Sequence, residues 1–341
     1  MFRPLATLTA LAAALTLTGC APAEEAPAPV ASEALVQKDN LVLYTGRAEA
    51  LIQPLIDMFT EETGITVEVR YAGSAELAAQ LLEEGDNSPA DVFLAQDAGA
   101  LGAISKAGLF APIPTEALAL VDRQFSDIDG FWVGVSGRAR ILNYNPERVT
   151  ELPESVLDLL KPEWKGRIGI APTNASFQAF VTAMRITEGD EVTAMWLAGM
   201  KENAVMFEKN GGILDAVETG VIDAGLINHY YWYAKANEVG VENMKSKLAP
   251  FRDGDLGNLV NVAGAGIIND NSASRAFIQF LLSEKAQTYF AEETAEYPMI
   301  YGIDVIPGLA PLQEYPAPDI DLSNLDSLQQ TLELIRAAGL I

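Results

Sequence analysis

Two adjacent tyrosines, Tyr230 and Tyr231, are the residues whose type and position point most directly to chemistry. They follow the apolar run 224–227, which reads as a buried strand, and an open α/β sheet binds its ligand at the carboxyl ends of its strands. A free phenol has a pKa of ~10, but a hard trivalent cation can displace its proton and bind the phenolate. The pair therefore predicts a metal site. The alternative is that alternation along a strand buries one ring and exposes its neighbour.

The remaining donor residues favour ferric iron among the common metals. Cys20 is the only cysteine and His229 the only histidine, so zinc would lack the ligands that it prefers. Calcium and magnesium prefer carboxylate and carbonyl oxygens. His229 has no nucleophile and orienting acid at a recognised spacing, which argues against a hydrolase and against enzymes in general. We expect His229 to be a hydrogen-bonded neighbour of the site or a surface residue, not a ligand.

The first twenty residues are typical of a bacterial lipoprotein signal. An apolar stretch at 5–17 is short for a membrane span, and small residues lead from it to Cys20. We expect residues 1–19 to be a signal peptide and Cys20 to carry the lipid. Residues 20–39, rich in Pro, Ala and Glu, predict a tether. The protein would then lie in the cell envelope, in the periplasm or on the outer face of a membrane, held only by its lipid anchor.

Composition limits the partners. The chain has 341 residues and 49% hydrophobic content, enough to build two lobes. Its net charge of -25 at pH 7 opposes binding to nucleic acid and to anionic lipid surfaces. The same acidity also serves solubility, so it says little about any one site. We expect a monomer without a nucleic-acid partner.

Strand and helix patterns alternate along the chain, which predicts an α/β fold with mixed, mainly parallel sheets. Strands are expected at 40–46, 65–71, 91–95, 165–172 and 260–268, and helices around 51–59, 75–84 and 177–187. The run 131–137 is the expected first crossing between lobes, and 260–268 is the return crossing. We expect lobe 1 to comprise 40–136 and 266–300, lobe 2 to comprise 137–265, and 301–341 to be a helical segment that packs on the lobes.

Four stretches of this chain follow the pattern of a known family. They are Tyr44-Thr45-Gly46-Arg47, the run 85–93, Ser136-Gly137-Arg138-Ala139-Arg140 and the run 227–232. Nearly the whole mature chain resembles the bacterial ferric-iron-binding substrate-binding proteins of ABC importers. The resemblance implies the periplasmic-binding-protein type II fold, in which two hinge-linked lobes close over ferric iron. It also implies Tyr230 and Tyr231 as metal ligands and an ABC importer permease as the partner.

The chain departs from the family pattern at three ligand positions. Ala48 stands where relatives often have histidine, Gln96 where they have glutamate, and Asn174 where some have a third tyrosine. Two phenolates fill only two of about six positions around an octahedral ion. The resemblance therefore implies a synergistic anion, carbonate or phosphate. Gln96 and Glu49 are candidates for an additional ligand.

Several residues suit a role in holding the anion or supporting the site. Arginines offer forked donors, and neutral amides and hydroxyls complete such a shell. The candidates are Arg47, Arg138, Asn174, Ser176, Asn210 and Asn228. The two arginines could equally form ordinary surface ion pairs. The run Asn210-Gly211-Gly212 predicts a helix start, where free amides face an anion or Asn210 caps the helix.

An organic cation such as a polyamine or thiamine is the alternative ligand on the same fold. Absence of the usual histidine and glutamate ligands keeps this hypothesis open. For the same reason, chelated iron is also an alternative ligand. An aromatic cage could hold such a cation, with a carboxylate as counter-charge. The cage would comprise Tyr44, Tyr230, Tyr231 and Trp232, with Asp97 or Glu49 as the carboxylate.

Overall fold

The computed structural model describes residues 35–341. The predicted signal peptide, Cys20 and all but the last five tether residues lie outside the described residues. Residues 35–39 contain no helix or strand, and the first strand begins at Asn40. Across 35–341, no helix has the length and apolarity needed to cross a membrane.

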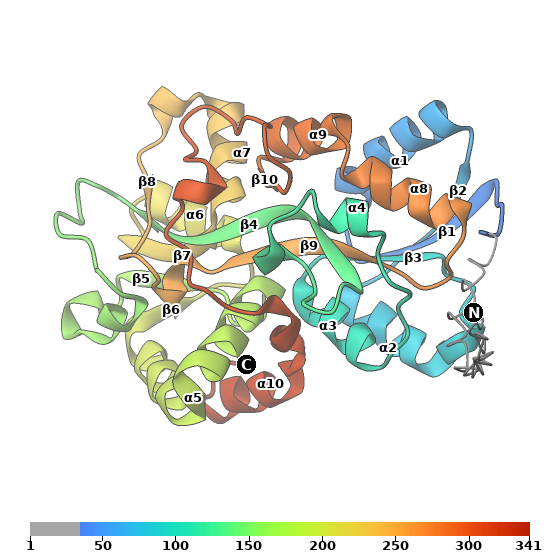
Figure 1. Ribbon diagram of the computed structural model, residues 1–341. Helices are drawn as coiled ribbons and strands as arrows, with labels where there is room; N and C mark the ends of the chain where they lie inside the picture. The colour runs from blue at the N-terminus through green and yellow to red at the C-terminus, as the bar shows by residue number, and fades with distance from the viewer. Residues whose placement is uncertain (1–34) are drawn as a thin grey trace, which may run out of the picture. The chain divides into compact units, whose positions relative to one another are not determined.

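The strands form one mixed sheet in the order β2-β1-β3-β9-β4-β7-β5-β6, with β8 and β10 also paired to β4 (Figure 1). Their bounds are β1 Asn40–Thr45, β2 Thr66–Tyr71, β3 Val92–Ala95, β4 Trp132–Tyr144, β5 Ile168–Ile170, β6 Ala204–Met206, β7 Ala224–Asn228, β8 Lys247–Ala249, β9 Val260–Ile267 and β10 Tyr297–Pro298. The predicted parallel pairing is found at the two ends, in β2-β1-β3 and in β7-β5-β6. Between them, β9 and β4 pair antiparallel with each other and with their neighbours, because both cross the middle of the sheet.

Helices connect the strands, as the alternating pattern predicts. The α-helices are α1 Glu49–Thr63, α2 Ser74–Glu84, α3 Ala98–Lys106, α4 Thr115–Leu118, α5 Ala175–Asn203, α6 Asn210–Glu218, α7 His229–Val239, α8 Ser272–Leu281, α9 Glu284–Thr294 and α10 Leu328–Ala337. Short 3-10 helices are η1 Gly85–Asn87, η2 Arg123–Phe125, η3 Val156–Leu160, η4 Pro162–Trp164, η5 Val241–Asn243, η6 Leu256–Asn258, η7 Leu312–Glu314 and η8 Leu322–Asp326. In α1, the apolar stripe that includes Leu55 and Phe59 is buried, and the helix ends at Gly64 in the left-handed conformation.

The segment labelled α5 consists of two helices that meet at Gly189, whose φ of 85° and ψ of 165° are not helical. The first of them therefore ends close to Thr187, as predicted, and the second continues to Asn203. Within the first helix, Phe180 and Met184 are buried, whereas Ile186 is 41% exposed. A residue two positions from Met184 points away from it on a helix, which explains the exposure of Ile186.

Strands β4 and β9 run side by side through the middle of the sheet (Figure 1). Their register shifts between Gly134 and Ser136, which marks an irregularity inside the predicted first crossing. The glycines of β9 reflect close packing, because a Cβ on Gly266 would lie 2.4 Å from the Phe110 ring. Glycine at this position of β9 therefore leaves room for the Phe110 ring to pack against the strand.

The segment 301–341 packs against two helices that follow different parts of the sheet. Its 3-10 helix η8 contacts α3, and its helix α10 contacts α5. The α10 contact includes a buried hydroxyl pair, Thr182 with Thr331, at 2.8 Å. Helices α3 and α5 begin at Ala98 and Ala175, and residues at both starts line the site described next.

Candidate metal centre

The tyrosine pair lies in the first turn of a helix. Strand β7 ends at Asn228 and α7 begins at His229, so Tyr230 and Tyr231 are no longer subject to the alternation of a strand. Their rings stack, with centroids 4.5 Å apart and an interplanar angle of 26°. Both residues are partly buried, so the alternative of one core ring and one exposed ring is wrong.

Strand β4 supplies two arginines to the region around the tyrosine pair. Arg138 and Arg140 are two residues apart, so both side chains point to one face of the strand. Both are buried. Burial raises the pKa of Tyr230, the charge of Tyr231 adds to this, and the positive charge of Arg138 opposes it. Burial lowers the pKa of Arg140 to about 9, against an opposing contribution from Tyr231. The charges of Arg138 and Arg47 therefore interact with Tyr230, and the charge of Arg140 interacts with Tyr231.

Arg47 is held by a carboxylate that the sequence did not indicate. Its Nη1 and Nη2 donate to Glu296 Oε1 and Oε2 at 3.0 and 2.6 Å, and Nη1 also donates to Gln96 Oε1 at 3.0 Å. Arg138 Nε lies 3.9 Å from the same carboxylate. All three charged groups are buried, so the interpretation of Arg47 and Arg138 as surface ion pairs is wrong. Glu296 lies 249 residues from Arg47 along the chain, so no local pattern could link the two.

His229 is a hydrogen-bonded neighbour of the tyrosines. Its Nδ1 accepts from the Ala139 N–H at 3.1 Å, which places the proton on Nε2, and Nε2 lies 2.7 Å from the Ala295 carbonyl oxygen. Burial lowers the pKa of the imidazole to about 4, so it is neutral at physiological pH. Both ring nitrogens are occupied. As expected, the side chain is not free to bind a metal.

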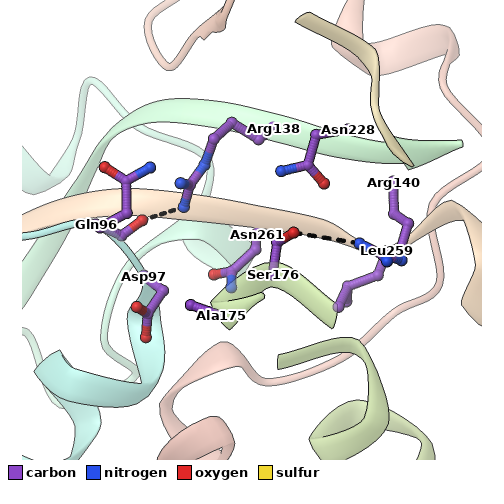
Figure 2. Close-up of a pocket in the computed structure, with 9 residues that line it drawn as sticks. All are labelled: Gln96, Asp97, Arg138, Arg140, Ala175, Ser176, Asn228, Leu259 and Asn261. Atoms are coloured by element: carbon purple, nitrogen blue, oxygen red, sulfur yellow. Dashed lines mark hydrogen bonds between the residues drawn. The ribbon is translucent and has the colours of Figure 1, made fainter. Parts of the chain in front are cut away.

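A small cavity of about 30 Å³ lies between β4 and the starts of α3 and α5 (Figure 2). It has room for about two water molecules or one small anion. Figure 2 shows Arg138 reaching toward Gln96, whose carbonyl oxygen it contacts, and Arg140 reaching toward Ser176. The lining residues are Gln96, Asp97, Arg138, Arg140, Ala175, Ser176, Asn228, Leu259 and Asn261. The tyrosines are not among them, although Asn228 directly precedes α7.

Arg140 is a candidate anion-binding residue that was not among the candidates predicted from the sequence. Its Nη1 donates to Ser176 Oγ at 3.3 Å, whereas its buried Nε and Nη2 have no partner. The guanidinium packs on Phe177 and Phe180, 5.5 and 5.3 Å from the ring centroids. A buried cation without a carboxylate is costly unless an anion binds it. The signal for Arg140 was its place in the family stretch Ser136-Gly137-Arg138-Ala139-Arg140, two residues after Arg138.

The start of helix α5 forms one side of this region. Asn174 is the N-cap, and its Oδ1 accepts from Ser176 N at 3.0 Å and Ser176 Oγ at 2.6 Å. Asn210 Nδ2 donates to the same hydroxyl at 3.3 Å, and its buried Oδ1 has no partner. Helix α6 begins at Asn210 with Lys209 as its N-cap, so the prediction that Asn210 caps the helix is wrong. Asn210 instead points its amide to the start of α5.

Two predicted residues lie elsewhere or are already occupied. Glu49 is exposed in the first turn of α1, and its charge acts on the phenol of Tyr71. It has no hydrogen bond to the tyrosine pair or to the arginines. Gln96 does lie at the cavity, but its amide oxygen accepts from Arg47 and its carbonyl oxygen accepts from Arg138.

The aromatic cage of the alternative hypothesis is not assembled. The Tyr44 hydroxyl donates to Glu84 Oε1 at 3.2 Å on α2, and Arg70 packs on the Tyr44 ring. Trp232 donates to the Ser246 carbonyl oxygen at 3.1 Å. Asp97 caps α3 by accepting from Ala100 N at 3.4 Å. These groups therefore satisfy structural partners and do not converge on the tyrosine pair.

Carboxylates and histidine do not form a metal site in the part of the chain that the structure describes. No three His, Cys, Asp or Glu side chains of residues 35–341 gather in a metal-binding group. A hard cation at this centre would therefore depend on phenolate oxygens and on a ligand from outside the chain.

Comparisons with known proteins identify the family of this chain. Residues 87–323 match the family described as bacterial extracellular solute-binding protein. The Fe(3+)-binding periplasmic protein of Serratia marcescens is 35% identical over 316 residues, which is 91% of this chain and 93% of that protein. Iron-bound HitA from Pseudomonas aeruginosa is 36% identical, with a TM-score of 0.80 over 88% of this chain and 99% of HitA. A Trichodesmium protein in complex with iron and citrate is 27% identical, with a TM-score of 0.77 over 88% and 99%.

The family consists of proteins that bind solutes for transport and is not an enzyme class. The solved relatives have two lobes of α/β structure, and the topology of β4 and β9 in this chain fits that arrangement. The sequence match, its coverage and the structural similarity lead to one conclusion: this chain belongs to the bacterial extracellular solute-binding proteins and has their two-lobed periplasmic type II fold.

Proposed function

We propose that this protein captures ferric iron outside the cytoplasm and delivers it to an ABC importer, with Tyr230 and Tyr231 as the metal ligands. The observation that carries the proposal is the stacked pair of phenols beside two buried arginines. Iron would displace both phenolic protons as it binds, and the positive charges of the arginines would favour the phenolates that result. The iron-binding names of the relatives in Serratia and Pseudomonas support this choice over an organic cation.

A synergistic anion would complete the coordination shell. The unpartnered Nε and Nη2 of Arg140 and the unpartnered Oδ1 of Asn210 fit a small oxyanion that still carries a proton or accepts a water bridge. Ser176 lies between them. Carbonate and phosphate both fit this donor set. Citrate is larger than the cavity of about 30 Å³ and would require the lobes to open further.

The lobes would close around this centre by bending where the paired strands β4 and β9 pass from one lobe to the other. Lobe 1 would comprise residues 40–136 and 266–300, and lobe 2 would comprise 137–265. The register shift after Gly134 supports a boundary near residue 136. Closure would bring Arg47 and Gln96 over the tyrosines and exclude water, and the permease would recognise the closed form. Residues 301–341 would pack on both lobes, in agreement with the contacts of η8 and α10.

The location outside the cytoplasm agrees with the periplasmic relatives. Lipidation at Cys20 after removal of residues 1–19 would hold the folded part near the membrane through the tether. The protein would act as a monomer, because a solute-binding protein must present both lobes to one permease. Metabolic labelling with a palmitate analogue tests the anchor, since Cys20→Ala should abolish the label.

A visible absorption spectrum tests the proposal directly. The purified chain is titrated with ferric citrate in bicarbonate buffer, and a broad phenolate-to-iron charge-transfer band is expected. The Tyr230→Phe/Tyr231→Phe variant should remain colourless, and Trp232→Phe on the same helix serves as the aromatic control. A wild-type protein that stays colourless in bicarbonate and in phosphate would reject this iron site and favour an organic or chelated ligand.

A further inference from the structure

The buried carboxylate of Glu296 lies at the centre of the charges around the tyrosine pair. It is 3% exposed and follows helix α9, far along the chain from Arg47 and the tyrosines. Beyond Arg47 and Arg138, its Oε2 accepts from Ser136 Oγ at 3.2 Å and Thr294 Oγ1 at 3.1 Å. Burial raises the pKa of Glu296, but the charge and hydrogen bonds of Arg47, with the charge of Arg138, outweigh burial and hold the pKa below its usual value. The two arginines and the two hydroxyl donors therefore favour the charged form of this carboxylate.

The backbone fixes this carboxylate relative to the tyrosines. Ala295 has φ 54°, the only positive φ among the non-glycine residues at 35–341, and such a conformation persists only where contacts hold it. Its carbonyl oxygen accepts from His229, the residue before Tyr230. Tyr297 pairs with Gly137 of β4 and its ring lies 4.8 Å from the His229 ring. The residue before Glu296 is thus hydrogen-bonded to α7, and the residue after it pairs with β4.

Glu296 divides the three buried arginines into two kinds. Arg47 and Arg138 share its carboxylate, whereas Arg140 has no carboxylate partner in the described chain. Three uncompensated guanidiniums would repel a trivalent cation and would attract anions at several points. With Glu296 in place, only Arg140 remains free to bind an anion.

We infer that Glu296 is the positioning residue that makes this cluster of arginines accept a cation: its charge offsets one of the two positive charges of Arg47 and Arg138, and its contacts with both leave Arg140 as the arginine that binds an anion. The inference rests on the proposed iron site and names the residue that sets its selectivity between cation and anion. Glu296 has no hydrogen bond to the phenol oxygens and is not itself one of the residues that line the cavity. Its charged contacts are Arg47 and Arg138, of which Arg138 lines the cavity, so it acts through the arginines.

The test measures iron and anion binding separately in Glu296→Gln, which keeps the shape and removes the charge. Ferric iron affinity, from competition with citrate, should fall at least about tenfold. Affinity of the iron-free protein for inorganic phosphate, from calorimetry, should rise several-fold because Arg47 and Arg138 are released. These two changes have opposite signs. A purely structural role would weaken both.

Asp223→Asn is the matched control. Asp223 is also buried and also pairs with two arginines, Arg148 and Arg167, but at the opposite end of β7 from the tyrosines. It should leave both affinities within about twofold of wild type. The charge-neutral double variant Arg47→Met/Glu296→Gln should bind iron more tightly than Glu296→Gln alone, because the excess positive charge is gone.

Weaker binding of both iron and phosphate by Glu296→Gln, or no change in either, would overturn the inference. If Glu296→Gln does not fold, Glu296→Asp replaces it. This variant keeps the negative charge and should therefore keep the preference for iron over phosphate. A Glu296→Asp variant that loses this preference would count against the inference. The phosphate measurement needs no iron. If the wild-type protein shows no iron band, the proposed function fails while the phosphate result still decides the role of Glu296.

Discussion

Replacement of Arg140 by methionine should make the ligand-free protein more stable and a poorer iron binder. The guanidinium is 2% exposed, packs on two phenylalanine rings and leaves two nitrogens unpartnered. Burial lowers the pKa of Arg140 from the ordinary arginine value of 12.5 to about 9, and a difference of this size corresponds to a cost of ~5 kcal/mol for the charged form. Methionine fills a similar volume without charge, so we expect the free energy of unfolding to rise by ~1–4 kcal/mol.

The pH dependence gives this prediction a second, independent measurement. Between pH 9 and 12.5 the unfolded chain keeps the proton on Arg140 and the folded chain loses it, so the unfolded state binds more protons and wild-type stability rises with pH. Below pH 9 both states are protonated and the full cost remains. The Arg140→Met variant lacks this dependence. The stability difference between variant and wild type should therefore shrink from pH 8.5 to pH 10.

The assay is urea unfolding of iron-free protein, with and without phosphate, followed by iron competition with citrate. Phosphate should stabilise the wild type and leave Arg140→Met unchanged, since a ligand stabilises only the state that binds it. Iron affinity in bicarbonate should fall in the variant, because the anion loses its main contact. A variant less stable than wild type at pH 8, or one still stabilised by phosphate, would refute the reasoning about an uncompensated cation.

Three further predictions concern proton release and packing. Iron affinity should decrease on acidification by up to about two log units per pH unit, since Tyr230 and Tyr231 each release a proton on binding; competition with citrate at pH 6, 7 and 8 measures this after correction for the protonation of citrate. Gly266→Ala should destabilise the protein by ~1–3 kcal/mol in urea unfolding, because its Cβ would collide with Phe110, and an unchanged midpoint would contradict the close packing of β9. Asn174→Ala should cost ~1 kcal/mol through loss of the α5 cap, seen in the same assay.

Local sequence patterns were sufficient for the elements that carry the site. The apolar stripe of α1, the strand that ends at Asn228 and the helix start at Asn210 all lie where periodicity and turn residues indicate. Such patterns work because a helix or strand buries one face, and the spacing of apolar residues records which face that is. The same short-range logic identified the tyrosine pair, since both the phenols and their position after a strand are visible within ten residues.

Partnerships across long sequence separations could not be predicted in this way. Glu296 meets Arg47 across 249 residues, and His229 meets Ala139 and Ala295 across 90 and 66. A glutamate near the end of a helix looks the same in sequence whether it is solvated or buried against two arginines. Sheet order is what brings β1, β4 and β10 together, and it depends on the packing of the whole chain.

Residue type and spacing along the chain thus established the α/β character, the family pattern and the phenol pair. Burial and partnership decided which arginine is neutralised and which is left for an anion. The physical reason is that an ion's energy depends on its surroundings: Arg138 and Arg140 are the same residue type two positions apart, yet the fold places a carboxylate near Arg138 and phenylalanine rings against Arg140. No property of the linear sequence distinguishes those environments.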